Sequence, residues 1–200
     1  PGPITMPDLD RILTATAPLT LASVARGAQP LVMADLARAA KHRAVFVALN
    51  DAAMSAAAEA ASFFAPELDV IEFPAWDCLP YDRSSPALSV SARRLSALHR
   101  LQAAPIGPQL LVTTINAVTQ RVPTPFRIRE SVRLLKPGME ISHEGLIALL
   151  RRQGYARADT AVDAGDFAVR GSVFDIVPSG LGSGLRLDFF GDELEVMRLF

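Results

Sequence analysis

The 200-residue sequence predicts an α/β fold: a parallel-sheet lobe followed by a small α+β domain with a mostly antiparallel sheet. In the first part, apolar runs of strand length alternate with helical periods, a pattern typical of parallel strands covered by helices. Two prolines in "QRVPTPF" (120–126) indicate a linker. Beyond it, strands follow one another, which favours antiparallel pairing. We therefore expect two domains, residues 1–122 and 123–200.

In the first domain, strands and helices are expected to alternate. Pro30 stands at a first-turn position of one helix, and Asn50 precedes another as a capping residue. The expected helices are 7–16, 30–42, 52–65 and 91–102, and the expected strands are 19–25, 43–50, 68–74 and 109–115.

In the second domain, "SVRLLKPGMEI" (131–141) predicts a strand and a turn. Residues 142–155 predict a helix with a serine cap and a glycine near its end. Strands are expected within 166–178, 185–191 and 193–200, and "GD" between the last two predicts a hairpin turn.

Composition excludes several classes of function. The net charge of −1 gives no electrostatic footprint for wholesale binding to DNA or a membrane. Cys78 is alone, so no internal disulfide or zinc site is expected, as in a reducing cytoplasm. No signal-peptide core or membrane-spanning run is found, so we expect a cytoplasmic protein without a membrane partner. The apolar end "MRLF" suggests a piece of a longer chain.

The turn "ARGAQPLV" (25–32) lies where an α/β domain of this kind binds a nucleotide phosphate. A working loop needs several glycines, a lysine for the phosphates and a hydroxyl for magnesium. Gly27 is its one glycine, no lysine or hydroxyl follows, and Pro30 removes a backbone amide. We therefore expect a degenerate P-loop-like lobe. The second glycine cluster, "SGLGSGL" (179–185), leads into a strand, so it does not fit a dinucleotide fingerprint either.

Other polar residues give weaker signals. The three histidines are not at metal-ligand spacing, and no acid–base pair or nucleophile triad stands out. The arginines of 89–100 fit a solvated helix face better than a DNA contact. The aromatic and acidic loop at 73–86 fits a segment anchored by Trp76 better than a ligand cleft.

The segment 154–180 contains the strongest candidates for a binding surface. Arg157 follows a helix, and Arg170 lies in a strand near Phe174, a combination typical of a protein–protein hot spot. The alternative is equally well supported: the arginines could be salt-bridged to Asp159, Asp163, Asp166 or Asp175 within the chain.

The blocks "GDFAVRGSVFDIVP" and "LRLDFFGDELEVMRLF" resemble the UvrB-like family of nucleotide excision repair. "FPAWDCLPYDRSSPALSVSARRLSALHRL" and "LLVTTINAVTQRVP" are similar to the amino-terminal UvrB-homology module of the Mfd family of transcription-repair coupling factors. UvrB carries a functional Walker loop and a long aromatic hairpin. The turn at 25–32 lacks the loop, and the span from Trp76 to Arg94 is too short for the hairpin.

The resemblance implies a non-catalytic module that recruits UvrA to lesions where RNA polymerase has stalled. It implies UvrA contacts at Arg157, Arg170 and Phe174, and UvrB has a further arginine at the position of Ala168. No cofactor is expected in this chain, because ATP and magnesium would belong to a downstream motor. RNA polymerase and DNA would likewise be bound by downstream domains. The alternative is a UvrB-like excinuclease subunit that binds DNA or nucleotide.

Overall fold

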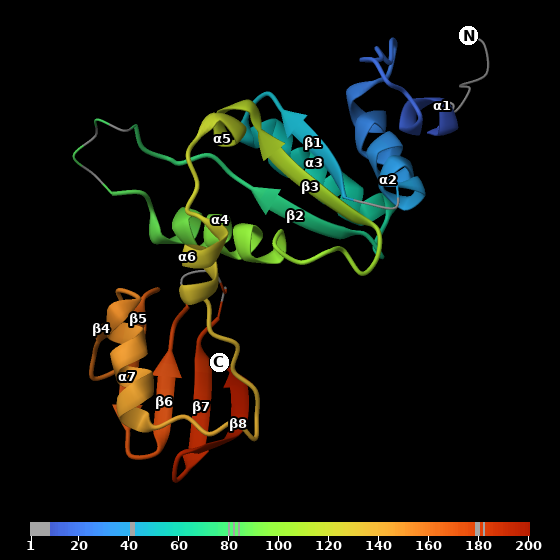
Figure 1. Ribbon diagram of the computed structural model, residues 1–200. Coiled ribbons are helices and arrows are strands. Elements are labelled where there is room, and N and C mark those ends of the chain that lie inside the picture. Colours follow the sequence, from blue (N-terminus) through green and yellow to red (C-terminus); the bar gives the residue numbers. More distant parts are fainter. Residues whose placement is uncertain are drawn as a thin grey trace. The chain divides into compact units, whose positions relative to one another are not determined.

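The computed structural model describes residues 9–40, 43–79, 81, 83, 85–178, 181 and 183–200. These residues divide into two compact units. The first groups Pro1–Trp76 with Arg100–Val122, and the second groups Asp77–His99 with Pro123–Phe200. The segment 77–99 is thus assigned to the second unit although the first unit continues after it. Each unit is described by itself (Figure 1).

The first unit is built on a parallel three-stranded sheet with the order β1-β3-β2. Alternating helices and strands were expected here, and the parallel sheet confirms that interpretation. Its elements are α1 (Leu9–Leu13), the 3-10 turn η1 (Arg26–Ala28), α2 (Gln29–Ala39), β1 (Ala44–Ala48), α3 (Asp51–Phe64), β2 (Asp69–Phe73), β3 (Gln109–Thr114) and α5 (Ile115–Thr119).

The core of the first unit is formed by α2, α3 and one face of the sheet. Its two helices contribute four fully or almost fully buried alanines, Ala34 and Ala37 from α2 and Ala58 and Ala61 from α3. Small side chains let two helices approach closely. As predicted, Pro30 lies in the first turn of α2, and the Asn50 side chain accepts a hydrogen bond from the Ala53 amide at 2.9 Å.

The prediction of a strand at 19–25 is wrong. The described backbone there contains turns, and Ser23 has a φ of 62°. Leu19 and Leu21 are 45% and 43% exposed, so the apolar run is not buried in the sheet. The sheet is complete without it, because β3 pairs with both β1 and β2.

The second unit contains a five-stranded sheet with the order β4-β5-β6-β7-β8. β4 and β5 are parallel and the other neighbours are antiparallel, which confirms the expected mostly antiparallel α+β arrangement. The strands are β4 (Ala156–Arg157), β5 (Asp166–Arg170), β6 (Val173–Ile176), β7 (Leu185–Phe190) and β8 (Glu193–Leu199). The helices are α4 (Leu88–Arg100), α6 (Pro125–Glu130) and α7 (His143–Arg152), the last residue of α4 being grouped with the first unit.

Two-residue loops join β5 to β6 and β7 to β8. Gly171 and Gly191 begin these loops, each with a φ of 61°, a backbone conformation that favours glycine. The turn predicted from "GD" is therefore confirmed at Gly191. The expected helix at 142–155 is also confirmed, since the Ser142 hydroxyl accepts a hydrogen bond from the Gly145 amide at 3.1 Å at the start of α7.

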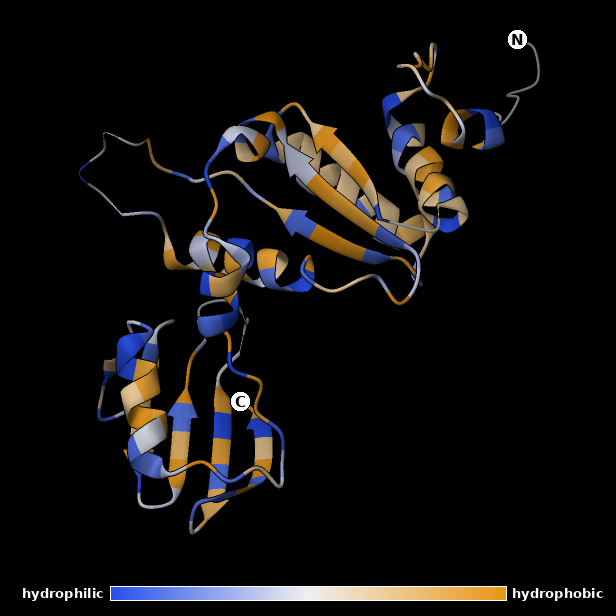
Figure 2. Ribbon diagram, in the orientation of Figure 1, coloured by the Kyte–Doolittle hydropathy of each residue, from blue (hydrophilic) through white to orange (hydrophobic). Residues whose placement is uncertain are grey.

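One face of this sheet packs against α7 (Figure 1). Strands β6 and β7 show alternating apolar and polar bands in Figure 2, as expected when the two faces of a sheet differ in burial.

The prediction of a strand within 131–141 is wrong. Apart from an isolated bridge between Glu140 and Glu193, the described backbone there forms no strand, whereas the expected turn is present at 137–138, where Gly138 has a φ of 83°. The short helices α5 and α6 were not predicted.

Within the described residues, no helix has both the length and the apolar character needed to cross a membrane. The same residues contain no group of three or more histidine, cysteine or carboxylate side chains arranged to hold a metal ion.

Candidate partner-binding face

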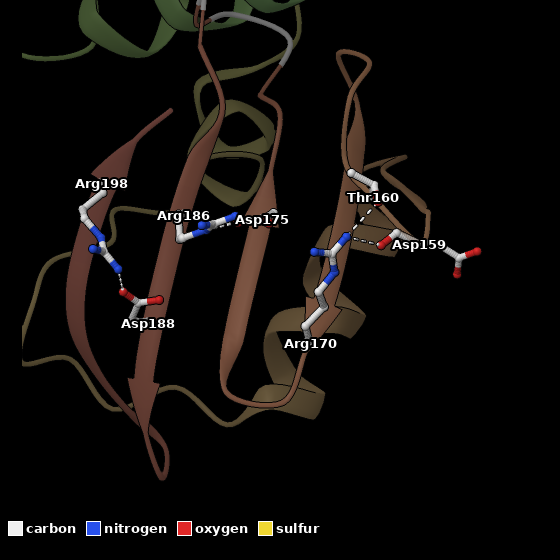
Figure 3. A network of polar contacts seen from close by, with 7 residues as sticks. All are labelled: Asp159, Thr160, Arg170, Asp175, Arg186, Asp188 and Arg198. Carbon is white, nitrogen blue, oxygen red and sulfur yellow. Dashed lines mark hydrogen bonds and ion pairs between the residues drawn. The ribbon is translucent and has the colours of Figure 1, made fainter.

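The sheet of the second unit has a charged face that follows from strand alternation. Phe167, Phe174 and Leu187 point into the core, so the residues next to them on the same strands point the other way. Strand register places Asp175 opposite Arg186 and Arg186 opposite Arg198. We define the charged face as the side chains that this alternation brings together, Arg170, Asp175, Arg186, Asp188 and Arg198 (Figure 3).

Two of these arginines are paired within the sheet. Arg186 donates from Nε and Nη2 to the two carboxylate oxygens of Asp175, at 2.6 and 2.7 Å. Such a bidentate geometry fixes both the distance and the orientation of the pair. Arg198 donates to the Asp188 carboxylate from Nη2. Figure 3 shows both pairs crossing between neighbouring strands.

The Asp175–Arg186 pair shifts the ionisation of both partners. The hydrogen bond from Arg186 is the main reason that the pKa of Asp175 lies below its usual value, and burial of the carboxylate opposes this effect. The charges of Arg186 and Arg170 lower the pKa of Asp175 further. The pKa of Arg186 is raised, mainly by its hydrogen bond to Asp175. Both groups are therefore charged at neutral pH.

Arg170 is exposed and forms no ion pair in the described part of the chain. Its Nη2 donates to the Thr160 hydroxyl at 2.7 Å and to the Asp159 carbonyl oxygen at 3.1 Å. Both acceptors are neutral, and the Asp159 carboxylate points away from the guanidinium (Figure 3). The positive charge of Arg170 thus remains available to a partner.

Arg157 is also exposed, and it lies in β4 at one edge of the described sheet. Among the described residues it takes part in no ion pair. The sequence had left open whether Arg157 and Arg170 are tied up by nearby aspartates. The structure favours the exposed alternative for both, because both are exposed and neither forms an ion pair with an aspartate among the described residues.

Phe174 requires a correction. The sequence suggested it as an apolar contact beside the arginines, but its side chain is 0% exposed. It lies on the core face of β6, where its ring is in edge contact with His143 and Phe189 at centroid distances of 5.2 and 5.4 Å. A partner cannot touch this ring while the sheet is folded. Phe174 therefore belongs to the hydrophobic core on the opposite side of the sheet from the charged face.

Ala168 is the position at which the resemblance suggested a missing arginine. It lies opposite Asp175 and is almost completely buried.

The Asp175–Arg186 and Asp188–Arg198 pairs were not predicted from the sequence. The charged residues at every second position of β7, Arg186 and Asp188, were the signal that could have indicated them, but pairing depends on which strands are neighbours.

The turn at 25–32 lies beside a hollow in the first unit. The walls are formed by Arg26, Gly27 and Pro30 together with the end of β1 and the alanines of α3. No lysine, serine or threonine lines this hollow. Its polar side chains are those of Arg26, Gln29 and Asn50, so the lysine and the hydroxyl that a Walker loop uses are missing from its walls.

Comparison with known proteins finds a family match for the part of the chain that carries the charged face. Residues 134–200 match the family described as the UvrB interaction domain. This stretch lies within the second unit and includes two of the sequence blocks that carried the resemblance.

The chain is also a homologue of transcription-repair-coupling factors, which confirms the resemblance predicted from the sequence. It is 38% identical to that of Haemophilus influenzae over 132 residues, which are 66% of this chain and 11% of the relative. With the factor of Escherichia coli it shares 33% identity over 131 residues, 66% of this chain and 11% of the relative. With that of Myxococcus xanthus it shares 32% over 177 residues, 84% of this chain and 14% of the relative. The chain therefore spans about a tenth of the length of the curated relatives it matches.

Proposed function

We propose that this chain is a non-catalytic module of a transcription-repair-coupling factor that recruits UvrA, with residues 123–200 as the UvrA-binding domain. The match of residues 134–200 to the UvrB interaction domain supports a role in assembling the excision machinery. The observation that carries the proposal is the contrast within the sheet. Arg186 and Arg198 are neutralised by aspartates, whereas Arg157 and Arg170 are exposed without an ion pair among the described residues.

This contrast suits recognition of an acidic partner surface. An arginine already paired in the free chain gains little from a new carboxylate, because the first pair must be broken. Arg170 has only neutral acceptors, so a partner carboxylate would add a charge-assisted hydrogen bond without such a loss. Its contact with Thr160 and Asp159 also orders the side chain before binding, which reduces the entropy lost on association.

Replacing Arg170 by alanine should weaken UvrA binding by about 1–3 kcal/mol, or about 5- to 150-fold, the range of an interface hot spot. Arg170 is exposed, so the melting temperature should change little. Titration calorimetry of UvrA against the chain measures the affinity. Arg157→Ala should act in the same direction, and replacing the exposed Arg151 of α7 by alanine is the matched control. If wild type and Arg170→Ala bind UvrA with equal affinity, Arg170 does not contribute to the interface.

The first unit is proposed to be a scaffold without a nucleotide site. The hollow beside Gly27 and Pro30 is lined by no lysine and no serine or threonine, the side chains that contact phosphates and magnesium in a Walker loop. ATP titrated into the chain with magnesium is therefore expected to give no binding heat. Saturable heat at micromolar ATP would instead favour the alternative of a UvrB-like subunit that binds nucleotide.

In the whole protein, ATP, magnesium, RNA polymerase and DNA are proposed to be bound by parts outside this chain. The relatives are about nine times longer than the matched region, which leaves ample length for a motor. The present chain would then connect a stalled polymerase to UvrA through its second unit.

A further inference from the structure

On the charged face, two arginines, Arg170 and Arg186, could each form a salt bridge with Asp175. Arg186 forms it, so Arg170 does not. Arg170 lies opposite Val173, and Ala168 lies opposite Asp175. Arg170 and Asp175 are therefore diagonal neighbours on the same face of an antiparallel pair, a separation that long side chains can span. A salt bridge between them is the most direct way in which the chain could neutralise Arg170 by itself.

Arg186 occupies the Asp175 carboxylate. It donates to both carboxylate oxygens, from two nitrogens of one guanidinium, at 2.6 and 2.7 Å. Asp175 is only 6% exposed, so few directions remain from which another donor could approach it. Arg170 accordingly donates to Thr160 and to the Asp159 carbonyl instead, as Figure 3 shows.

We propose that Arg186 is a positioning residue for partner binding, which holds Asp175 and thereby leaves Arg170 open to a partner carboxylate. This inference rests on the proposed UvrA recruitment for its biological meaning. Arg186 itself need not touch the partner. Its effect is transmitted through Asp175, the residue that would otherwise capture Arg170.

Removing the Arg186 guanidinium leaves a nearly buried carboxylate without its cation. A buried charge is costly unless it is paired, so Asp175 will attract the nearest remaining guanidinium on the face. That guanidinium belongs to Arg170, one strand away and diagonal in register. Arg170 would then leave its neutral acceptors and form an ion pair with Asp175. A partner carboxylate could bind Arg170 only by breaking that pair.

The expected effect on binding follows from the fraction of molecules in which Arg170 is open. If Arg186→Met reduces that fraction to about a tenth, the apparent affinity for UvrA falls about tenfold. Methionine keeps most of the aliphatic stem of Arg186. In the double variant Asp175→Ala/Arg186→Met, no carboxylate competes, and affinity should return to within about threefold of wild type. The matched control is Arg38→Met, which breaks the ion pairs with Asp35 and Glu67 in the first unit, outside the charged face, and should leave affinity within about twofold.

A measurement without UvrA tests the same inference directly. Phenylglyoxal modifies accessible arginines, and mass spectrometry of the digested chain reports the rate at Arg170. The rate should fall several-fold in Arg186→Met and recover in the double variant, with circular dichroism melting curves to show that each variant is folded. If Arg186→Met does not fold, Asp175→Asn/Arg186→Gln compared with Arg186→Gln provides the same comparison.

The outcomes separate the two proposals. An Arg170 modification rate that is equal in wild type, Arg186→Met and the double variant overturns the role of Arg186, whether or not UvrA binds. A rate that falls and recovers as expected supports that role. If the modification rate falls and recovers as expected but the wild-type chain does not bind UvrA, the proposed recruitment of UvrA is overturned. The proposed role of Arg186 in keeping Arg170 unpaired is then still supported.

Discussion

Replacing Phe174 by alanine is expected to lower the free energy of unfolding of the second unit by about 3–5 kcal/mol, the range for a buried aromatic side chain. The ring is 0% exposed and is enclosed by Leu146, Leu187 and other apolar residues of the same core. Its loss removes apolar contacts and leaves a cavity between α7 and the sheet. Urea unfolding followed by circular dichroism measures the change. Any loss of UvrA binding should accompany unfolding and be recovered at lower temperature.

The matched control is Phe190→Ala on β7. Phe190 is 76% exposed, so its removal should change stability by less than about 0.5 kcal/mol. A Phe174→Ala variant that melts like wild type but binds UvrA weakly would contradict the placement of this ring in the core. It would return Phe174 to the interface suggested by the sequence.

Replacing Ala61 by leucine is expected to lower the free energy of unfolding of the first unit by about 1–3 kcal/mol, the usual cost of overpacking. Ala61 is completely buried in the cluster formed by α2, α3 and the sheet. Ala34 and Ala37 of α2 belong to the same cluster and are also fully buried. The three carbons that leucine adds at position 61 therefore have no free space and must displace a helix. Thermal melting by differential scanning calorimetry measures the change.

Ala56→Leu provides the control for that substitution. Ala56 lies on the same helix but is exposed, and leucine and alanine have similar helix propensities. Its melting temperature should stay within a degree or two of wild type. Equal melting temperatures for Ala61→Leu and wild type would show that the two helices separate more easily than their close packing implies.

Much of the fold could be predicted because local signals agreed with tertiary structure. The Asn50 and Ser142 caps and the turn at Gly191 each specify backbone geometry within a few residues. The error at 19–25 has the opposite cause. An apolar run indicates burial, but whether a sheet has room for another strand depends on pairings elsewhere in the chain.

The binding face was predictable only in part. Arg157 and Arg170 were candidates from the residues and then from the resemblance, but the residues alone could not decide whether aspartates neutralise them. That decision depends on register, since Asp175 lies opposite Arg186 on β7 and diagonal to Arg170 on β5. Phe174 was misplaced for a related reason: its neighbours in sequence are on the charged face, whereas its own side chain is on the other.

The order of the strands in the first unit has a consequence for synthesis on the ribosome. β3 separates β1 from β2 in the sheet, yet it is the last of the three to be translated. A nascent chain that ends before Gln109 holds two apolar strands whose common hydrogen-bonding neighbour does not yet exist. The first unit therefore completes its sheet only after residues 77–99, which are grouped with the second unit, have already left the exit tunnel.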